Sequence, residues 1–286
     1  MKKSVLSILF LAGAMIAMPS EAQILKKIQQ AAQQGAENAV TKKTRESTEK
    51  ATSDALDGMF GGMMQPAPTE SEYSFTGYMV MEVTATDKKG KSEEPVRMQY
   101  LLSSGTEFMG MSFSDPKQPS TTTTTIMDTK NQAMVMLLED KGNKSSMAMK
   151  LNYDKLQGMV DEEAEEQLEQ PDYEITKTGN TKTILGYTCE EYLVKTEDGD
   201  GQYWVTEEPI EGFSMFSPQS NPMVSDKTIE RYSSMFSNAP KGSFMEMVFT
   251  DKDGAVTDMK VVELETDSPR KFQMSDYPNM MSGGGK

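Results

Sequence analysis

Methionine recurs in this chain as Met-x-Met pairs, and the thioether side chain limits the chemistry that such pairs can perform. A thioether sulfur binds soft ions such as Cu(I), is oxidised reversibly to the sulfoxide, and otherwise behaves as a flexible apolar group. Each pair lies in a segment that alternates like a β-strand, and the strand period of two places both side chains on one face. The five pairs are Met79/Met81, Met109/Met111, Met134/Met136, Met147/Met149 and Met245/Met247.

Three interpretations of these pairs remain open on the sequence alone. Methionine fills irregular gaps, so the pairs can be ordinary core residues. The same flexibility suits a cavity for an acyl chain or an apolar peptide segment. Cu(I) binding or oxidant buffering is the third interpretation, which the absence of histidine and the wide spread of the methionines disfavour.

The absence of histidine also bears on catalysis. Ser-His-Asp and Cys-His nucleophiles, histidine general bases and the usual zinc sites all need an imidazole. The acidic run at 161–166 fixes no ligand geometry, and the loop at 197–202 lacks the later ligands of a calcium-binding loop. We therefore expect no enzyme activity, no catalytic residue, no resident metal and no cofactor.

The methionine pairs can share one face only if their strands belong to one sheet. Alternating segments predict a β domain that contains these strands over residues 73–280. Its short alternating segments are joined by turn residues such as Asp87-Lys-Lys-Gly90, Lys141-Gly142-Asn143 and Asp253-Gly254, which imply an antiparallel meander. Segments 155–170 and 225–239 have helical spacing, and the second places Met235 and Phe236 on one face. The predicted fold is mainly β (α+β): a curved antiparallel sheet with one or two helices on its concave side.

The residues before this domain predict export. Residues 1–22 combine two lysines, an apolar run and a small-x-small site ending at Ala22, the pattern of a cleaved signal peptide. Residues 23–57 have loosely helical spacing and predict an arm able to self-associate. A Gly/Pro linker at 58–72 follows, and 281–286 form a flexible tail. We expect a periplasmic protein, with release from the cell as the alternative location.

The composition of the chain also limits which kinds of partner it can bind. The chain has a formal net charge of -15, which disfavours binding to nucleic acid. After the leader, no segment is apolar enough for a transmembrane helix. Cys189 is the single cysteine, so no intramolecular disulfide forms, and its alternating position predicts a buried, inert thiol.

Residues 182–209, KTILGYTCEEYLVKTEDGDGQYWVTEEP, resemble the signature of a family of exported bacterial proteins, domain of unknown function 4412. The closing segment at 271–280, KFQMSDYPNM, is similar to the end of that family's domain. The matching positions are Gly186, Tyr187, Cys189, Tyr192, Trp204, Val205 and Thr206. Physically, the glycine suits a bend or a close backbone approach, and the aromatic residues suit packing across strands.

This family resembles the superfamily of the lipoprotein carrier LolA and its receptor LolB. The resemblance implies an unclosed antiparallel β-barrel whose helices close an apolar cavity for acyl chains. The characteristic arginine of the carrier has no matching position here, and the carriers lack the arm at 23–57. We therefore carry over the fold and an expectation of a hydrophobic ligand, and no individual functional residue.

These observations predict a non-enzymatic periplasmic protein that binds a lipid, a lipoprotein acyl chain or an apolar peptide in its concave interior. The predicted lining residues are Met79, Met81, Met109, Met111, Met134, Met136, Met245 and Met247, with Met235 and Phe236 from the covering helix. The alternative is a structural or interaction protein of the cell envelope, with a fully packed interior and an arm that mediates assembly.

Overall fold

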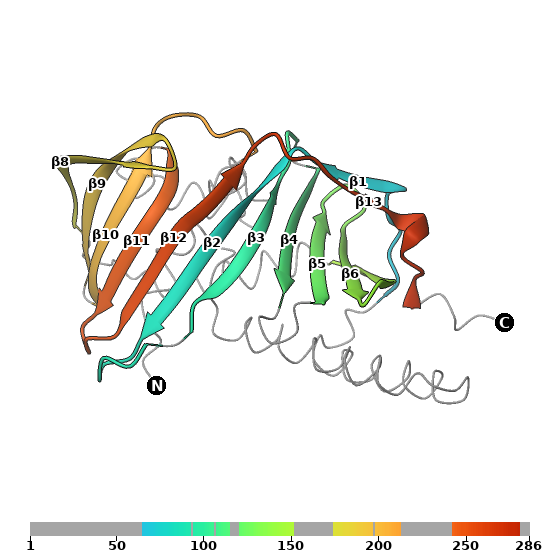
Figure 1. Cartoon of the computed structure of the whole chain (residues 1–286), viewed down its shortest axis with the longest axis horizontal. Helices are drawn as coiled ribbons and strands as arrows, with labels where there is room; N and C mark the ends of the chain where they lie inside the picture. The colour runs from blue at the N-terminus through green and yellow to red at the C-terminus, as the bar shows by residue number, and fades with distance from the viewer. Residues whose placement is uncertain are drawn as a thin grey trace.

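A computed structural model of the chain describes seven stretches of the sequence (Figure 1). They are residues 65–92, 94–105, 107–114, 120–151, 174–196, 198–212 and 242–280. Several predicted elements lie outside the described residues: the signal peptide (1–22), the helical arm (23–57), most of the linker (58–72), the helices at 155–170 and 225–239, and the tail (281–286).

The described residues form thirteen strands and one short 3-10 helix, η3. The strands of the first half are β1 (Glu72–Phe75), β2 (Gly77–Thr86), β3 (Val96–Leu102), β4 (Phe108–Ser114), β5 (Thr121–Asp128), β6 (Ala133–Asp140) and β7 (Asn143–Lys150). The second half contains β8 (Glu174–Ile184), β9 (Tyr187–Thr196), β10 (Gly199–Thr206), β11 (Ser243–Asp251), β12 (Val256–Glu265), β13 (Arg270–Gln273) and η3 (Met274–Asp276).

Eleven of these strands form one antiparallel sheet in the order β7-β6-β5-β4-β3-β2-β12-β11-β10-β9-β8. The order consists of two meanders, β2 to β7 and β8 to β12, which meet where β2 pairs with β12. Strand directions rotate steadily across the sheet, as the right-handed twist of strands requires (Figure 1). The predicted antiparallel meander is therefore confirmed and occurs twice.

Aspartate side chains hold two of the predicted turns. Between β2 and β3, the Asp87 carboxylate accepts hydrogen bonds from the backbone N–H groups of Lys89 and Lys91. Between β11 and β12, Asp251 accepts equivalent bonds from Asp253 and Ala255. Such turns form because a short acidic side chain can replace a backbone acceptor.

A second, two-stranded layer of β1 and β13 covers one end of the large sheet (Figure 1). Its aromatic residues pack in a core cluster with Leu101, Ile126, Val135 and Leu137 of the large sheet. The Phe75 ring lies edge-on to Phe108 at 5.3 Å between centroids, directly above Gly110. A Cβ at Gly110 would lie 2.7 Å from that ring, so the glycine makes the close approach possible.

Residues 73–86 alternate like one continuous strand in the sequence, but they form two strands in two different sheets. The chain changes layer at Thr76, whose N–H donates to the Leu102 carbonyl at 2.8 Å. At Gly77 a Cβ would lie 2.0 Å from the Glu265 carbonyl oxygen, so only glycine fits this crossing. Alternation continues through Thr76 without a break, which is why the sequence pattern misses the change.

The two ends of the large sheet differ. Residues 65–67 and 278–279 hydrogen-bond along the outer side of β7, where Lys150 N–H donates to the Gln65 carbonyl and Ser146 N–H to the Pro278 carbonyl. At the other end, β8 contains an irregular register around Gly179, whose φ is +85°. Covering, bulges and charges are the usual means of blocking unwanted strand pairing at sheet edges.

The prediction of a mainly β, antiparallel fold is confirmed. Across the described stretches the large sheet stays open rather than closing into a barrel, with β7 and β8 at its ends. Those stretches contain a single helix, η3. The predicted covering helices and the N-terminal arm fall on residues outside them.

Candidate functional site

One face of the large sheet carries methionine on eight adjacent strands, and we term it the methionine face. Directly opposed residues of antiparallel neighbours point to the same side of a sheet, so the strand register identifies its members. They are Met147, Met149, Met134, Met136, Met127, Met109, Met111, Met98, Met79, Met81, Met259, Met247 and Met245. The register thus brings together every strand methionine predicted to line one interior, whereas Met235 and Phe236 lie outside the described residues.

Many of these methionines face one another directly across neighbouring strands. The opposed pairs are Met81/Met98, Met109/Met127, Met127/Met134, Met134/Met149, Met136/Met147 and Met247/Met259. The isolated residues Met98, Met127 and Met259 were not among the predicted lining residues. Hairpin register from the predicted turns could have found them, because each lies opposite a residue of a Met-x-Met pair.

One part of the methionine face is packed. Met79, Met81 and Met245 have no exposed surface. They belong to a core cluster with Met259 and with Ile210, from the segment that follows β10. We term this part, on β2, β11 and β12, the packed sector.

Another part of the face retains solvent exposure. Met98 on β3, Met111 on β4 and Met134 on β6 are each only partly buried. We term these three residues the accessible sector. An apolar ligand that binds this face would make its first contacts here, because these thioethers still have surface to lose to a ligand.

Charge is separated between the two faces of the sheet. Along the eight methionine-bearing strands, Asp140 and Asp251 are the only charged residues on the methionine face, and each ends its strand. The opposite face instead carries ion pairs such as Arg97–Glu82 at 2.8 Å, Lys260–Glu82 at 3.5 Å and Lys182–Glu246 at 2.6 Å. The methionine face is therefore suited to an apolar partner and unsuited to a charged one.

Tyr203 is a polar exception at the margin of the methionine face, opposite Met247. Among the described residues, its buried hydroxyl has no hydrogen-bond partner. Burial raises the pKa of this phenol, which therefore stays protonated and keeps a donor without an acceptor. Such a group is destabilising, because it loses its bonds to water without replacing them.

Replacing Tyr203 with phenylalanine is accordingly expected to raise the free energy of unfolding by about 1–2 kcal/mol. Urea-induced unfolding of both proteins measures the difference. Tyr73→Phe is the matched control and should destabilise, because the Tyr73 hydroxyl donates to Asp128 at 2.7 Å. A loss of stability in Tyr203→Phe would show that its hydroxyl has a partner in solution.

The family-signature residues have structural contacts. Gly186 has a φ of +89° in the β8–β9 turn, and a Cβ there would meet no atom of the described residues within 4 Å. The residue therefore serves the bend, and the alternative of a close backbone approach is wrong. Tyr192 lies opposite Tyr203, and the Lys182 ammonium lies 4.2 Å from the centre of the Trp204 ring. Tyr187 packs against the same core cluster as the methionines.

Cys189 is fully buried, as predicted. Burial raises the pKa of its thiol, chiefly through desolvation. The register places Lys182 opposite Cys189, but the lysine ammonium is paired with Glu246 at 2.6 Å. A thiol in this setting is a poor nucleophile.

Two further observations concern the described stretches only. They contain no group of three or more histidine, cysteine, aspartate or glutamate side chains arranged to hold a metal ion. None of their helices has the length and apolarity needed to cross a membrane.

Comparison with protein families matches residues 75–276 to the family described as domain of unknown function DUF4412. Comparison with curated proteins finds no match. Among solved structures, PNGF-II in the C2 space group is 10% identical with a TM-score of 0.26, covering 73% of this chain and 30% of that chain. The β-barrel-like DUF1849 protein from Brucella abortus is 8% identical with a TM-score of 0.23, covering 67% and 98% respectively. Scores this low carry no structural or functional argument.

Proposed function

The chain belongs to the DUF4412 family, and we propose that it is an exported, non-catalytic protein that binds a hydrophobic ligand on its methionine face. The ligand is an acyl chain of a lipid or lipoprotein, or an apolar peptide segment. The observation that carries this proposal is the run of methionine over eight adjacent strands, with charge confined to two strand ends.

Methionine suits this role better than branched residues would. Leucine or isoleucine in these positions would give a more rigid surface, because methionine has more rotatable bonds and a polarisable sulfur. A surface of opposed thioethers can adjust to acyl chains of different length and unsaturation. The accessible sector is the proposed point of contact, and the packed sector holds the sheet in place.

Substitution of Met98 and Met111 by glutamine tests the proposal. Both residues are partly exposed, so polar side chains of similar length should be tolerated by the fold. The affinity for a fluorescent long-chain fatty acid is expected to fall by at least about tenfold, because burying methionine surface supplies part of the binding free energy. Leu193→Gln is the control, since Leu193 is 38% exposed and lies on β9 outside the methionine face.

Native mass spectrometry of the protein purified gently from its own host gives an independent test. An adduct of lipid-like mass that is lost on denaturation would support binding. A bare protein that also fails to bind the fluorescent fatty acid would contradict it. That result would favour the alternative of an envelope interaction protein, for which the full burial of Met79, Met81 and Met245 is the supporting observation.

A further inference from the structure

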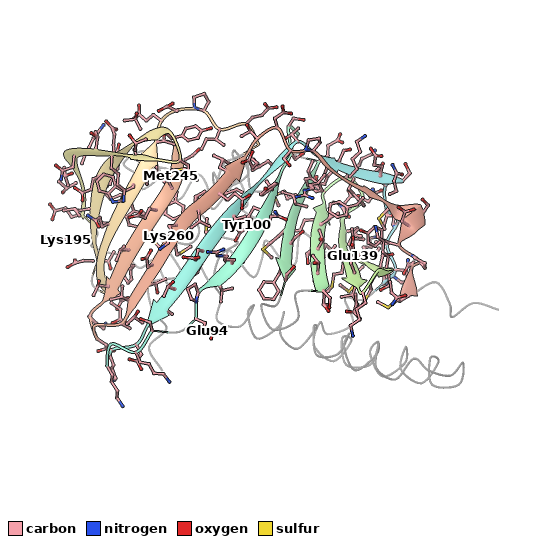
Figure 2. The ribbon with its side chains drawn as sticks, in the orientation of Figure 1. Glu94, Tyr100, Glu139, Lys195, Met245 and Lys260 are labelled. Atoms are coloured by element: carbon pink, nitrogen blue, oxygen red, sulfur yellow. The ribbon has the colours of Figure 1, made fainter. Side chains whose placement is uncertain are left out.

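A cleft of about 880 Å³ lies on the face of the sheet opposite the methionines. Strands β2 to β6 form its floor, while β13 and Tyr277 form one wall. Its size is within the range of small-molecule binding sites in proteins. Figure 2 shows Glu139, one of its lining residues, near the β6 end of the sheet, far from Lys195 on β9.

Hydroxyl groups line the floor of the cleft in two pairs. Ser112 and Thr124 are both more than nine-tenths buried, and their oxygens lie 2.7 Å apart. Ser114 and Thr122 form a second pair at 2.9 Å. In each pair one hydroxyl donates to the other, which leaves one O–H able to donate to a ligand.

The carboxylates of the cleft are already neutralised. Glu82 accepts from Arg97 at 2.8 Å and lies 3.5 Å from the Lys260 ammonium, and the Arg97 bond lowers its pKa. Glu139 accepts from the Tyr277 hydroxyl and lies 3.7 Å from the Lys144 ammonium. Neither carboxylate therefore repels an anion with a full charge at close range.

Cationic donors remain available in the same cleft. The Arg97 bond to Glu82 uses only Nε, so its terminal nitrogens are not consumed by it. Arg270 lies over the Tyr78 ring at 5.3 Å, and no carboxylate of the described residues forms an ion pair with it. A guanidinium in this situation retains its full set of donors for a carboxylate or phosphate.

The charge of the cleft differs in sign from that of the protein. Its described lining contains four cationic side chains, Arg97, Lys144, Arg270 and Lys271, against the two carboxylates Glu82 and Glu139. Lys271 is paired with Glu72 outside the lining at 3.4 Å, so the excess rests on the arginines. The whole chain has a net charge of -15. A local excess of cations in an acidic protein concentrates anions at that point.

We propose that this cleft binds a small organic anion, with Arg270 contacting its carboxylate or phosphate and the Ser112/Thr124 pair donating to its remaining oxygens. The Arg270 guanidinium and the two hydroxyl pairs are donors, so the complementary ligand is rich in oxygen acceptors. The site lies on the opposite face from the methionines and does not depend on the function proposed for them.

Three sugars of similar size test this site: glucuronate, glucose 6-phosphate and glucose, titrated by NMR at low ionic strength. The dissociation constant of at least one anionic sugar is expected to be lower than that of glucose by about tenfold or more, because one charge-assisted contact contributes about this much. A preference between the two anions distinguishes a carboxylate site from a phosphate site. Added salt should weaken binding, because the contact is exposed enough to be screened.

Variants then locate the site. Arg270→Gln is expected to weaken binding of the anionic sugar by about tenfold, and Lys195→Gln to change it less than about twofold. Ser112→Ala with Thr124→Val removes both members of a hydroxyl pair, so the fold should survive while binding weakens. The proposal is overturned if no sugar binds, if glucose binds as tightly as the anions, or if Arg270→Gln has no effect.

Discussion

Phe75→Ala is expected to lower the free energy of unfolding by about 3–5 kcal/mol, the range for removing a large buried aromatic side chain. Phe75 is 2% exposed and joins the β1–β13 layer to the large sheet. Its ring contacts Phe108 at 5.3 Å and Phe272 at 6.0 Å between centroids. Alanine would leave a cavity above Gly110, because the glycine has no side chain to fill the space that the ring occupies.

Urea-induced unfolding measures this effect, and hydrogen exchange locates it. The amides of β1 and β13 should lose protection earlier than those of β9 and β10, which lie in the other half of the sheet. Leu193→Ala is the control, because this residue is 38% exposed and should change stability by less than about 0.5 kcal/mol. A loss below about 1 kcal/mol for Phe75→Ala would mean that the two-strand layer contributes little to the fold.

Asp128→Ala is expected to lower the free energy of unfolding by about 3 kcal/mol, because it breaks several charge-assisted hydrogen bonds in a buried place. Asp128 is 1% exposed. It accepts from the Tyr73 hydroxyl at 2.7 Å, and from the backbone and side-chain nitrogens of Asn131 at 2.8 and 2.7 Å. Alanine would leave the buried Tyr73 hydroxyl without its acceptor.

Asp87→Ala is the matched control for this variant. Asp87 accepts two backbone N–H groups in a turn of similar chemistry but is exposed to solvent, so its loss should be below about 1 kcal/mol. The double variant Tyr73→Phe with Asp128→Ala should lose less than the two single variants together, because they remove the same bond. Strict additivity in chemical denaturation would contradict the coupling of these two residues.

The methionine face could be anticipated because strand alternation is a local property. Each Met-x-Met pair fixes its own two side chains on one side, and the turns at Asp87 and Asp253-Gly254 fix which strands are neighbours. Those short-range signals extend only through consecutive hairpins. They predicted an antiparallel meander, and they left undetermined that it occurs as two runs and that β2 pairs with β12.

The pairs formed by distant segments could not be predicted in this way. Glu72 lies opposite Gln273, and Met81 lies opposite Val261, but no local pattern marks these partners. The cleft depends on the same contacts, since Arg270 reaches Arg97 and Ser112 only after β13 returns over the sheet. In the sequence, Arg270 and Phe272 are part of an ordinary alternating segment. They line the cleft together only once the β1–β13 layer has packed on the large sheet.

Because β2 pairs with β12, the two halves of the large sheet can join only after most of the chain has been synthesised. The first meander emerges with β2 at its free edge, and the residue opposite Met81 follows 180 positions later, at Val261. Closing so long a loop is slow, and an unpaired strand edge beside an uncharged face is prone to join another chain. Strand β13, which completes the aromatic core above Gly110, emerges later still. A newly made molecule therefore needs protection from its neighbours until β12 and β13 have appeared.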